Sequence, residues 1–289
     1  MDATRIVAIR HGETAWNAES RLQGHQDIAL NPQGQRQADT LAQALRDEGL
    51  VAVYSSDLAR AWQTAQALAE PLALALQADV GLRERCFGEF EGLTYAQIDA
   101  RWPEQARRWR QRELDFVPVG AESLGHFHAR CVTTLDRLAA AHVGQAIAVI
   151  CHGGVLDSFY RAANRLALKL PRQWTLGNAT INRLLHTPQG LRVVGWNDAG
   201  HLDTPACDET STRGAERPPL RPHLASAADF TPGVLGRLNQ GHIAQAAAEY
   251  RAVRGMAGAD QPAVAEPQQV QPRGIGRGRD LCRGEVGDR

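Results

Sequence analysis

Two short polar turns, each directly after a run of apolar residues, carry a histidine. Residues 6–9 lead into Arg10-His11-Gly12, and residues 146–150 lead into Cys151-His152-Gly153-Gly154. A histidine at the end of a buried strand can present a ring nitrogen to a ligand, and an adjacent arginine offers a charged fork that suits phosphoryl oxygens. The first turn taken alone is more typical of a structural histidine than of a functional one. Further residues are therefore needed before a phosphate site is indicated.

An arginine and a glutamate supply that support. The run Ser55-Ser56-Asp57 offers an N-cap, which places Arg60 about one turn into a helix that extends to about residue 69. Glu84 lies in a glycine-punctuated loop, where its carboxyl group could meet a leaving group; the alternative is a solvated glutamate. His152 begins a helix, whose free N–H groups and dipole favour an anion. Two histidines and two arginines that converge on one strand edge favour phosphate chemistry.

The elements that must position these residues alternate between strand and helix. Short apolar runs predict strands, and apolar residues at helical spacing predict helices. The expected strands are residues 6–9, 51–54, 72–76, 146–150, 180–187 and 191–196, and the main expected helices are residues 32–48, 58–69, 95–112 and 123–142. We therefore predict an α/β fold, a three-layer α/β/α sandwich around a mostly parallel sheet. In such sheets ligands bind beyond the carboxyl ends of the strands, where both histidine turns lie.

Composition restricts the class of partner. Among 289 residues, 32 Lys and Arg balance 32 Asp and Glu, so we expect no general attraction to nucleic acid or to an anionic membrane. The 5 cysteines stand singly, which indicates neither a disulfide framework nor a thiolate zinc site. The N-terminus lacks the pattern of a signal peptide, and no apolar run approaches the ~20 residues of a membrane span. The chain is therefore expected to be soluble and cytoplasmic.

The sequence divides into two regions of different composition. All 6 Trp and 14 of the 16 aromatic residues precede residue 204, whereas residues 205–289 hold 8 of the 14 Pro and 11 of the 27 Gly. We predict a domain at residues 1–204 and a Pro-, Gly-, Arg- and Ala-rich tail at residues 205–289. The tail is expected to be flexible and largely disordered, because it can bury little apolar surface. Residues 241–254 are its best candidate for a helix.

These motifs together resemble the phosphoglycerate mutase-like histidine phosphatase superfamily. The matching stretches are RHGETAWN at residues 10–17, RLQG at 21–24, SSDLAR at 55–60, LRE at 82–84, ES at 122–123 and HGG at 152–154. They stand in the order that the family has them and span residues 5 to about 203. The resemblance implies the family's α/β/α fold, and it does not extend into the tail.

The resemblance also implies a role for each motif residue. His11 would be the nucleophile that becomes phosphohistidine, Glu84 the proton donor to the leaving alcohol, and Arg10, Arg60 and His152 the ligands of the phosphoryl oxygens. Surrounding cations are expected to lower the pKa of His11 and keep the ring neutral. Neither a metal nor a cofactor is implied, because the arginines and His152 can stabilise the charge. The candidate substrate-binding set joins Arg10, Arg60, Glu84 and His152 with Asn17, Gln23, Gly24 and Gly153.

The reaction stays open between hydrolysis and transfer. Only 67 residues separate Glu84 from His152, and residues 21–27 resemble the RxQGxxD pattern of α-ribazole phosphatase-like and broad-specificity members. Both features favour a phosphatase that acts on a small phosphomonoester. A phosphoglycerate mutase-type transfer is the first alternative, and a non-catalytic module that binds a phospho-ligand is the second.

The substrate and the oligomeric state are less constrained. A small phosphorylated metabolite is the expected partner, and a homodimer through an edge strand is compatible with the fold. Several arginines between residues 94 and 125 could recognise a second anionic group on the substrate or merely solvate a helix, and the second interpretation is favoured. They are Arg101, Arg107, Arg108, Arg110 and Arg112.

Overall fold

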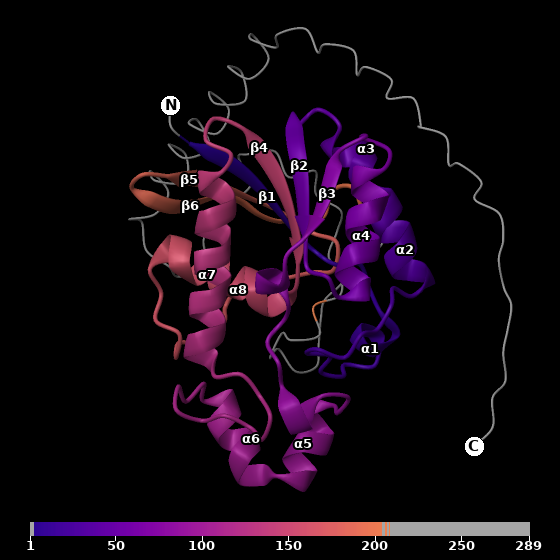
Figure 1. The fold of residues 1–289 in the computed structure, drawn as a ribbon. Helices are drawn as coiled ribbons and strands as arrows, with labels where there is room; N and C mark the ends of the chain where they lie inside the picture. Colours follow the sequence, from indigo (N-terminus) through magenta and orange to yellow (C-terminus); the bar gives the residue numbers. More distant parts are fainter. Residues whose placement is uncertain (1–2, 204–205, 207, 209–289) are drawn as a thin grey trace, which may run out of the picture.

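A six-stranded mixed sheet forms the centre of the protein (Figure 1). The computed structural model describes residues 3–203, 206 and 208; the candidate helix at residues 241–254 and the rest of the predicted tail lie outside the described residues. The strands are β1 (Thr4–Arg10), β2 (Leu50–Ser55), β3 (Ala75–Ala78), β4 (Ala146–Cys151), β5 (Ile181–Thr187) and β6 (Gly190–Asp198). Their order across the sheet is β3-β2-β4-β1-β5-β6. The first four strands run parallel, whereas β5 is antiparallel to its neighbours β1 and β6.

Helices cover both faces of the sheet, which confirms the predicted α/β/α sandwich (Figure 1). They are α1 (Ala15–Ala18), α2 (Pro32–Asp39), α3 (Leu41–Leu45), α4 (Ala59–Ala69), α5 (Tyr95–Arg101), α6 (Pro103–Arg110), α7 (Leu124–Ala140) and α8 (Gly153–Asn164). In β1, Ile6 and Ala8 pack in the core with α7 and α8, whereas Val7 and Ile9 pack in the core with α3 and α4. Alternate side chains of a strand point to opposite faces, so a strand covered on both sides needs a continuous apolar run.

Three predicted elements differ from the observed ones. The helix predicted at residues 95–112 is two helices that meet at Trp102, because Pro103 begins α6 and a proline disfavours helical backbone at the residue before it. The helix predicted at residues 32–48 is interrupted at Thr40, whose hydroxyl donates to the Gln37 carbonyl oxygen at 2.9 Å. The strand predicted at residues 72–76 is displaced to β3, because the chain is still turning out of α4 at Ala73, where φ is 52°.

The register of the sheet brings three strand ends together. Arg10 at the end of β1 pairs with Cys151 at the end of β4, and the His11 N–H donates to the Cys151 carbonyl oxygen at 3.0 Å. The Ser56 N–H, directly after β2, donates to the Ile150 carbonyl oxygen at 3.0 Å. The residues that follow β1, β2 and β4 therefore lie at one edge of the sheet, its carboxyl edge.

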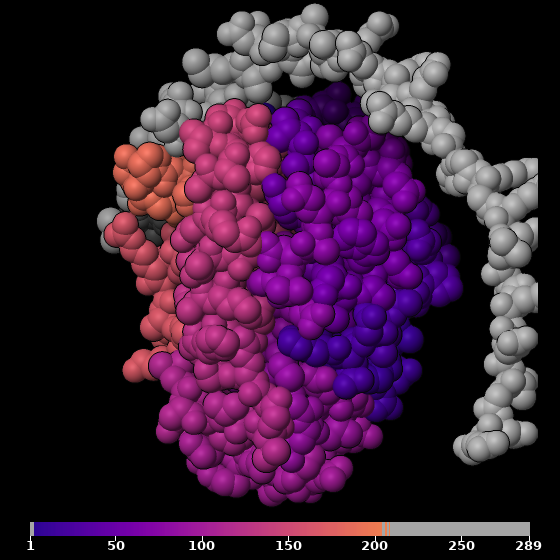
Figure 2. Space-filling view, viewed as in Figure 1, coloured from indigo at the N-terminus to yellow at the C-terminus, as the bar shows by residue number. Residues whose placement is uncertain are grey.

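A cap, residues 87–118, lies at one end of the molecule and carries α5 and α6 (Figure 1). Its own apolar cluster is centred on the buried Phe90, whose ring centroid is 4.7 Å from that of Trp109 and 5.4 Å from that of Trp102. The space-filling view shows a surface that continues from the cap onto α7 and the rest of the domain (Figure 2). The cap therefore packs on the same body that carries the sheet.

Candidate active site

The five candidate catalytic residues come together at the carboxyl edge of the sheet. His11 follows β1, His152 follows β4, and their ring centroids are 5.2 Å apart. Arg10 lies over the second histidine turn: a Cβ added to Gly153 would stand 3.6 Å from its guanidinium carbon. Arg60 is in the first turn of α4, close enough to both histidines that its charge lowers the pKa of each. None of the five, Glu84 included, is more than 9% exposed.

His11 has the protonation state of a nucleophile. Its Nδ1 donates a hydrogen bond to the Gly12 carbonyl oxygen at 2.7 Å, so the lone pair of the neutral ring is on Nε2. Burial lowers the pKa of His11 well below its usual value, and the positive charges of Arg60 and Arg10 lower it further. The bond to Gly12 acts in the opposite direction and is the smaller effect. The ring is therefore neutral at neutral pH, with an available nitrogen beside two cations.

Arg60 provides a fixed positive charge. Its Nη1 donates to the Gln26 carbonyl oxygen at 2.9 Å, and its Nη2 donates to the Gly24 carbonyl oxygen at 2.8 Å. Burial lowers the pKa of Arg60 to about 10, so the guanidinium still carries its charge at neutral pH. Within the described part of the chain its Nε has no hydrogen-bond acceptor. A buried, charged and oriented donor of this kind suits a phosphoryl oxygen.

The residues predicted to cap the Arg60 helix have other partners. The N-cap of α4 is Leu58, whose side chain cannot cap, so the predicted cap at residues 55–57 is wrong and Arg60 lies in the first turn. The Ala59 N–H donates instead to Oδ1 of Asp27 at 2.6 Å. The Asp57 carboxylate instead pairs with Arg83 at 2.5 Å. The Ser56 Oγ shares a 2.8 Å hydrogen bond with Nε2 of His152. The strand end after β2 therefore orients a candidate catalytic histidine.

Glu84 is a buried carboxyl group and not the solvated glutamate of the alternative interpretation. Its Oε2 accepts a hydrogen bond from the Gly154 N–H at 2.9 Å, and its Oε1 accepts one from the Arg85 N–H at 2.7 Å. The first contact ties Glu84 to the first turn of α8, next to His152. His25 donates from Nε2 to the Glu84 carbonyl oxygen at 2.8 Å. The carboxyl group is thus held beside the histidine pair.

The other candidate substrate-binding residues shape the same loop. Asn17 is buried, and its Oδ1 accepts from the Thr14 N–H at 3.0 Å and from the Thr14 hydroxyl at 2.9 Å. Gly24 supplies the carbonyl oxygen that holds Arg60. Gln23 is 7% exposed, and its buried Oε1 has no hydrogen-bond partner among the residues that the structure describes. Gln23 is therefore the member of this group best suited to contact a ligand directly.

Asn178 belongs to the site although no sequence motif points to it. It is fully buried, and its Nδ2 donates to the His11 carbonyl oxygen at 3.1 Å. The next N–H, that of Ala179, lies 3.1 Å from the Arg10 carbonyl oxygen and 3.2 Å from that of His11. The only local signal was a Gly-Asn pair before a predicted strand, which indicates a turn. The segment before β5 therefore supports the backbone of the Arg10-His11 turn.

Gly12 is required by the fold. A Cβ at this position would stand 2.5 Å from the Gly34 carbonyl oxygen in the first turns of α2, and a Cβ at Gly34 would stand 2.0 Å from the Glu13 carbonyl oxygen. Two backbones thus meet where neither residue can carry a side chain. This contact fixes the loop that follows His11 against α2.

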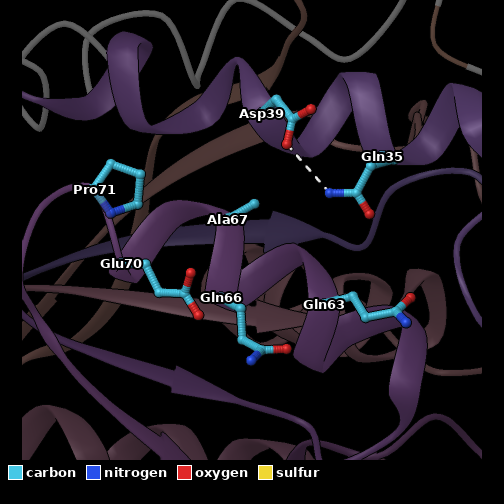
Figure 3. A pocket seen from close by; sticks show the side chains of 7 residues that line it. All are labelled: Gln35, Asp39, Gln63, Gln66, Ala67, Glu70 and Pro71. Carbon is cyan, nitrogen blue, oxygen red and sulfur yellow. Dashed lines mark hydrogen bonds between the residues drawn. The ribbon is translucent and has the colours of Figure 1, made fainter.

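The described residues contain no further arrangement with an obvious reaction chemistry. Among them, no group of three or more His, Cys, Asp or Glu side chains could hold a metal ion. None of their helices is long and apolar enough to cross a membrane. A surface groove of about 510 Å³ lies between α2 and α4, lined by amides and by the carboxylates of Asp39 and Glu70 (Figure 3). It contains none of the five candidate residues, and its carboxylates would repel a phosphate.

The fold and the site define the class of protein. The chain belongs to the histidine phosphatase superfamily, branch 1, whose sequence profile matches residues 6–199. Phosphoglycerate mutase-like protein 4 of Arabidopsis thaliana is 38% identical over 207 residues, which are 70% of this chain and 89% of that protein.

Solved structures support the same family assignment. A mycobacterial glucosyl-3-phosphoglycerate phosphatase is 32% identical, covers 68% of this chain and 99% of its own, and has a TM-score of 0.61. The phosphoserine phosphatase of Entamoeba histolytica, in complex with 3-phosphoglyceric acid, is 26% identical, covers 69% of this chain and 99% of its own, and has a TM-score of 0.63. Relatives of this chain are therefore phosphatases or mutases, and they bind small phosphorylated ligands.

Proposed function

We propose that this protein is a metal-independent phosphatase that hydrolyses a small phosphomonoester through a phosphohistidine on His11. The observation that carries the proposal is the buried, neutral His11: its Nε2 is unprotonated, its ring centroid lies 5.2 Å from that of His152, and the charges of Arg60 and Arg10 act on it. Phosphoryl transfer needs an aligned nucleophile and positive groups at the equatorial oxygens, and little else from the protein.

In the first step, Nε2 of His11 forms a bond to phosphorus while the bond from phosphorus to the leaving oxygen breaks. Arg10, Arg60 and His152 hold the three remaining oxygens. Glu84, in its protonated form, gives its proton to the leaving alcohol. Its place beside the first turn of α8 supports this role, because the Gly154 N–H fixes one carboxyl oxygen there.

In the second step, a water molecule attacks the phosphohistidine. The Glu84 carboxylate takes a proton from that water, the bond between nitrogen and phosphorus breaks, and inorganic phosphate leaves. His11 returns to the neutral form that its surroundings favour. The cycle therefore ends with both residues in their starting states.

We further propose that the alcohol part of the substrate carries a carboxylate. Two arginines, Arg85 and Arg112, line a cavity of about 30 Å³ together with Trp109, Glu113, Phe116, Pro118 and Leu124, and Arg85 directly follows Glu84 in the chain. The Glu113 carboxylate is paired with Arg108 at 2.6 Å. Burial lowers the pKa of both arginines; burial and the charge of Arg112 together bring that of Arg85 to about 10. Arg112 is already paired with Asp157 at 3.1 Å, but Nε of Arg85 donates to a neutral acceptor, the Glu122 carbonyl oxygen, at 2.8 Å. A ligand anion would offset the cost of burying the Arg85 charge.

Three more arginines of the cap are paired with carboxylates. Arg107 pairs with Glu104 and Arg108 with Glu113, each at 2.6 Å, and Arg110 pairs with Asp99. They solvate and brace the cap, whereas the role proposed for Arg112 departs from the favoured prediction that this set merely solvates a helix. The relatives named above support the same substrate class, since 3-phosphoglyceric acid carries a carboxylate and so does the substrate named for the mycobacterial phosphatase.

The test is a phosphate-release assay in EDTA over pairs of substrates that differ only in the carboxylate: phosphoserine with phosphoethanolamine, and 3-phosphoglycerate with glycerol 3-phosphate. We expect hydrolysis of all four with a preference for the first of each pair, and an acid-labile phosphoenzyme that His11→Ala abolishes. Turnover that survives His11→Ala would sink the mechanism. Isomerisation of phosphoglycerate faster than phosphate release would instead identify a mutase.

A further inference from the structure

Two described residues beyond the region that matches the family contact the active-site scaffold. The family match ends at residue 199, whereas Ala206 and Asp208 belong to the predicted tail. The Asp208 side chain is only 2% exposed. Its Oδ1 lies 3.0 Å from Nη2 of Arg172, and its Oδ2 accepts a hydrogen bond from the Leu176 N–H at 2.9 Å. A buried carboxylate that is this fully engaged has a defined place in the structure.

Asp208 and Arg10 are both hydrogen-bonded to the same residue, Leu176. Nη1 of Arg10 donates a hydrogen bond to the Leu176 carbonyl oxygen, while the Leu176 N–H donates to Asp208. The two bonds are thus made by the two backbone groups of a single residue. The positive charges of Arg172 and Arg10 keep the pKa of Asp208 below its usual value although burial acts in the opposite direction. The carboxylate is therefore ionised, and its charge interacts with that of the Arg10 guanidinium.

An independent contact fixes the neighbouring residue. A Cβ added to Gly177 would stand 2.5 Å from Cβ of Ala206, so Ala206 packs where only glycine fits. The Gly177 N–H also donates to Oδ1 of Asn197 at 2.8 Å. Asn178, the next residue, supports the His11 carbonyl oxygen. Residues 176–178 are thereby held between Ala206 and Asp208 on one side and the Arg10-His11 turn on the other.

We propose that Asp208 is a positioning residue for Arg10, acting through Leu176, so that a residue beyond the matched region completes the phosphate site. The inference rests on the proposed function, in which Arg10 holds a phosphoryl oxygen. A guanidinium binds such an oxygen well only when its planar fork is held in one orientation. The hydrogen bond to the Leu176 carbonyl oxygen holds one nitrogen of that fork. The bond from the Leu176 N–H to Asp208 fixes the position of Leu176 and therefore of its carbonyl group.

A merely structural role for Asp208 predicts a different result. Loss of a structural anchor lowers the melting temperature and leaves the affinity of the folded protein for phosphate unchanged. Loss of a positioning residue weakens phosphate binding, and does so only while Arg10 is present. The two roles are separated by a binding measurement on folded protein and by a double-mutant cycle.

The experiment uses the full chain and compares Asp208→Ala, Asp208→Asn and the control Asp203→Asn, which alters an exposed aspartate nearby. Calorimetry gives the Kd for inorganic phosphate, and p-nitrophenyl phosphate gives kcat and KM. For Asp208→Ala we expect Kd to rise and kcat/KM to fall by about tenfold, the usual effect of a lost buried hydrogen bond. Asp208→Asn keeps an oxygen that can accept from the Leu176 N–H, so it should stay within about threefold of wild type.

The cycle repeats Asp208→Ala in the Arg10→Ala background, where Kd should change by less than about twofold. An unchanged Kd in the single variant, or the same rise in both backgrounds, would overturn the inference and leave the phosphatase proposal intact. Coupled phosphate binding in a protein that hydrolyses no ester would instead overturn the phosphatase proposal alone. A wild-type protein that neither binds phosphate nor hydrolyses esters would overturn both.

Discussion

The Ser56 hydroxyl and Nε2 of His152 share a 2.8 Å hydrogen bond across 96 residues of sequence, in the fully buried centre of the site. The bond joins the end of β2 to the end of β4, which are neighbours in the sheet. It fixes one nitrogen of the ring and so determines which way His152 faces. Because burial lowers the pKa of His152 well below its usual value, the ring that Ser56 orients is neutral in the unliganded protein.

Ser56→Ala should therefore reduce turnover. Without the hydroxyl, His152 loses the partner that sets its orientation, and we expect kcat with p-nitrophenyl phosphate to fall by about tenfold or more. Ser55→Ala is the matched control, because Ser55 is equally buried at the same strand end but bonds the Ser56 carbonyl oxygen and not His152. If both variants lose kcat equally, the bond to His152 has no catalytic role.

Glu84→Gln should have an effect that depends on the leaving group. A poor leaving group such as an alkyl alcohol needs the proton from Glu84, so phosphoenzyme formation should slow by about 100-fold or more. p-Nitrophenolate leaves without a proton, and the loss in that step should be much smaller. Rapid-quench measurement of phosphoenzyme formation with the two esters checks this. Equal losses would make Glu84 a structural residue.

Arg85→Gln should reveal whether the buried arginine pair binds a carboxylate. KM for 3-phosphoglycerate should rise about tenfold, the scale of one charge-assisted contact, while KM for glycerol 3-phosphate changes little. Arg107→Gln is the control, because Arg107 is exposed and pairs with Glu104 at the cap surface. A parallel rise in KM for both esters in Arg85→Gln would contradict the carboxylate site.

Stability should fall as the solution is acidified. His11 and His152 both have a pKa well below the usual value in the folded protein, so below about pH 6.5 the unfolded chain binds protons that the folded one does not. Each histidine then removes up to about 1.4 kcal/mol of unfolding free energy per pH unit, and neither contributes above that pH. Urea titrations at several pH values check this. His11→Asn and His152→Asn should each flatten the slope, and the exposed His126→Asn should not.

Gly34→Ala should destabilise the protein by about 2 kcal/mol or more, because the new Cβ would collide with the Glu13 carbonyl oxygen at 2.0 Å and displace α2 from the loop after His11. Gly125→Ala, in the first turn of α7 with nothing within 4 Å of its Cβ, should be neutral or stabilising. Chemical denaturation of both variants gives the comparison. A neutral Gly34→Ala would mean that the close approach of the two backbones is not needed.

Much of the fold could be predicted because its signals are local. The apolar runs of β1 and β4 each fit a strand buried on both faces. The helix predicted from residue 123 is observed as α7, and the Ser123 side chain caps it. The predictions that are wrong lie where another contact or turn overrides the local signal. Asp57 looked like a helix cap, but the guanidinium of Arg83 binds its carboxylate. Residues 72–74 looked apolar enough for a strand, but the backbone is still completing a turn.

The sequence by itself determined that two histidine turns and an arginine would follow strands of a mostly parallel sheet, because strand, turn and helix signals depend on neighbouring residues. Only the tertiary structure decided which nitrogen of His11 is free, that Ser56 orients His152, and that Arg85 and Arg112 share one cavity. The same holds for Asn178, which supports His11 across 167 positions. Such contacts depend on register and packing between distant segments, and no local pattern in the chain encodes them.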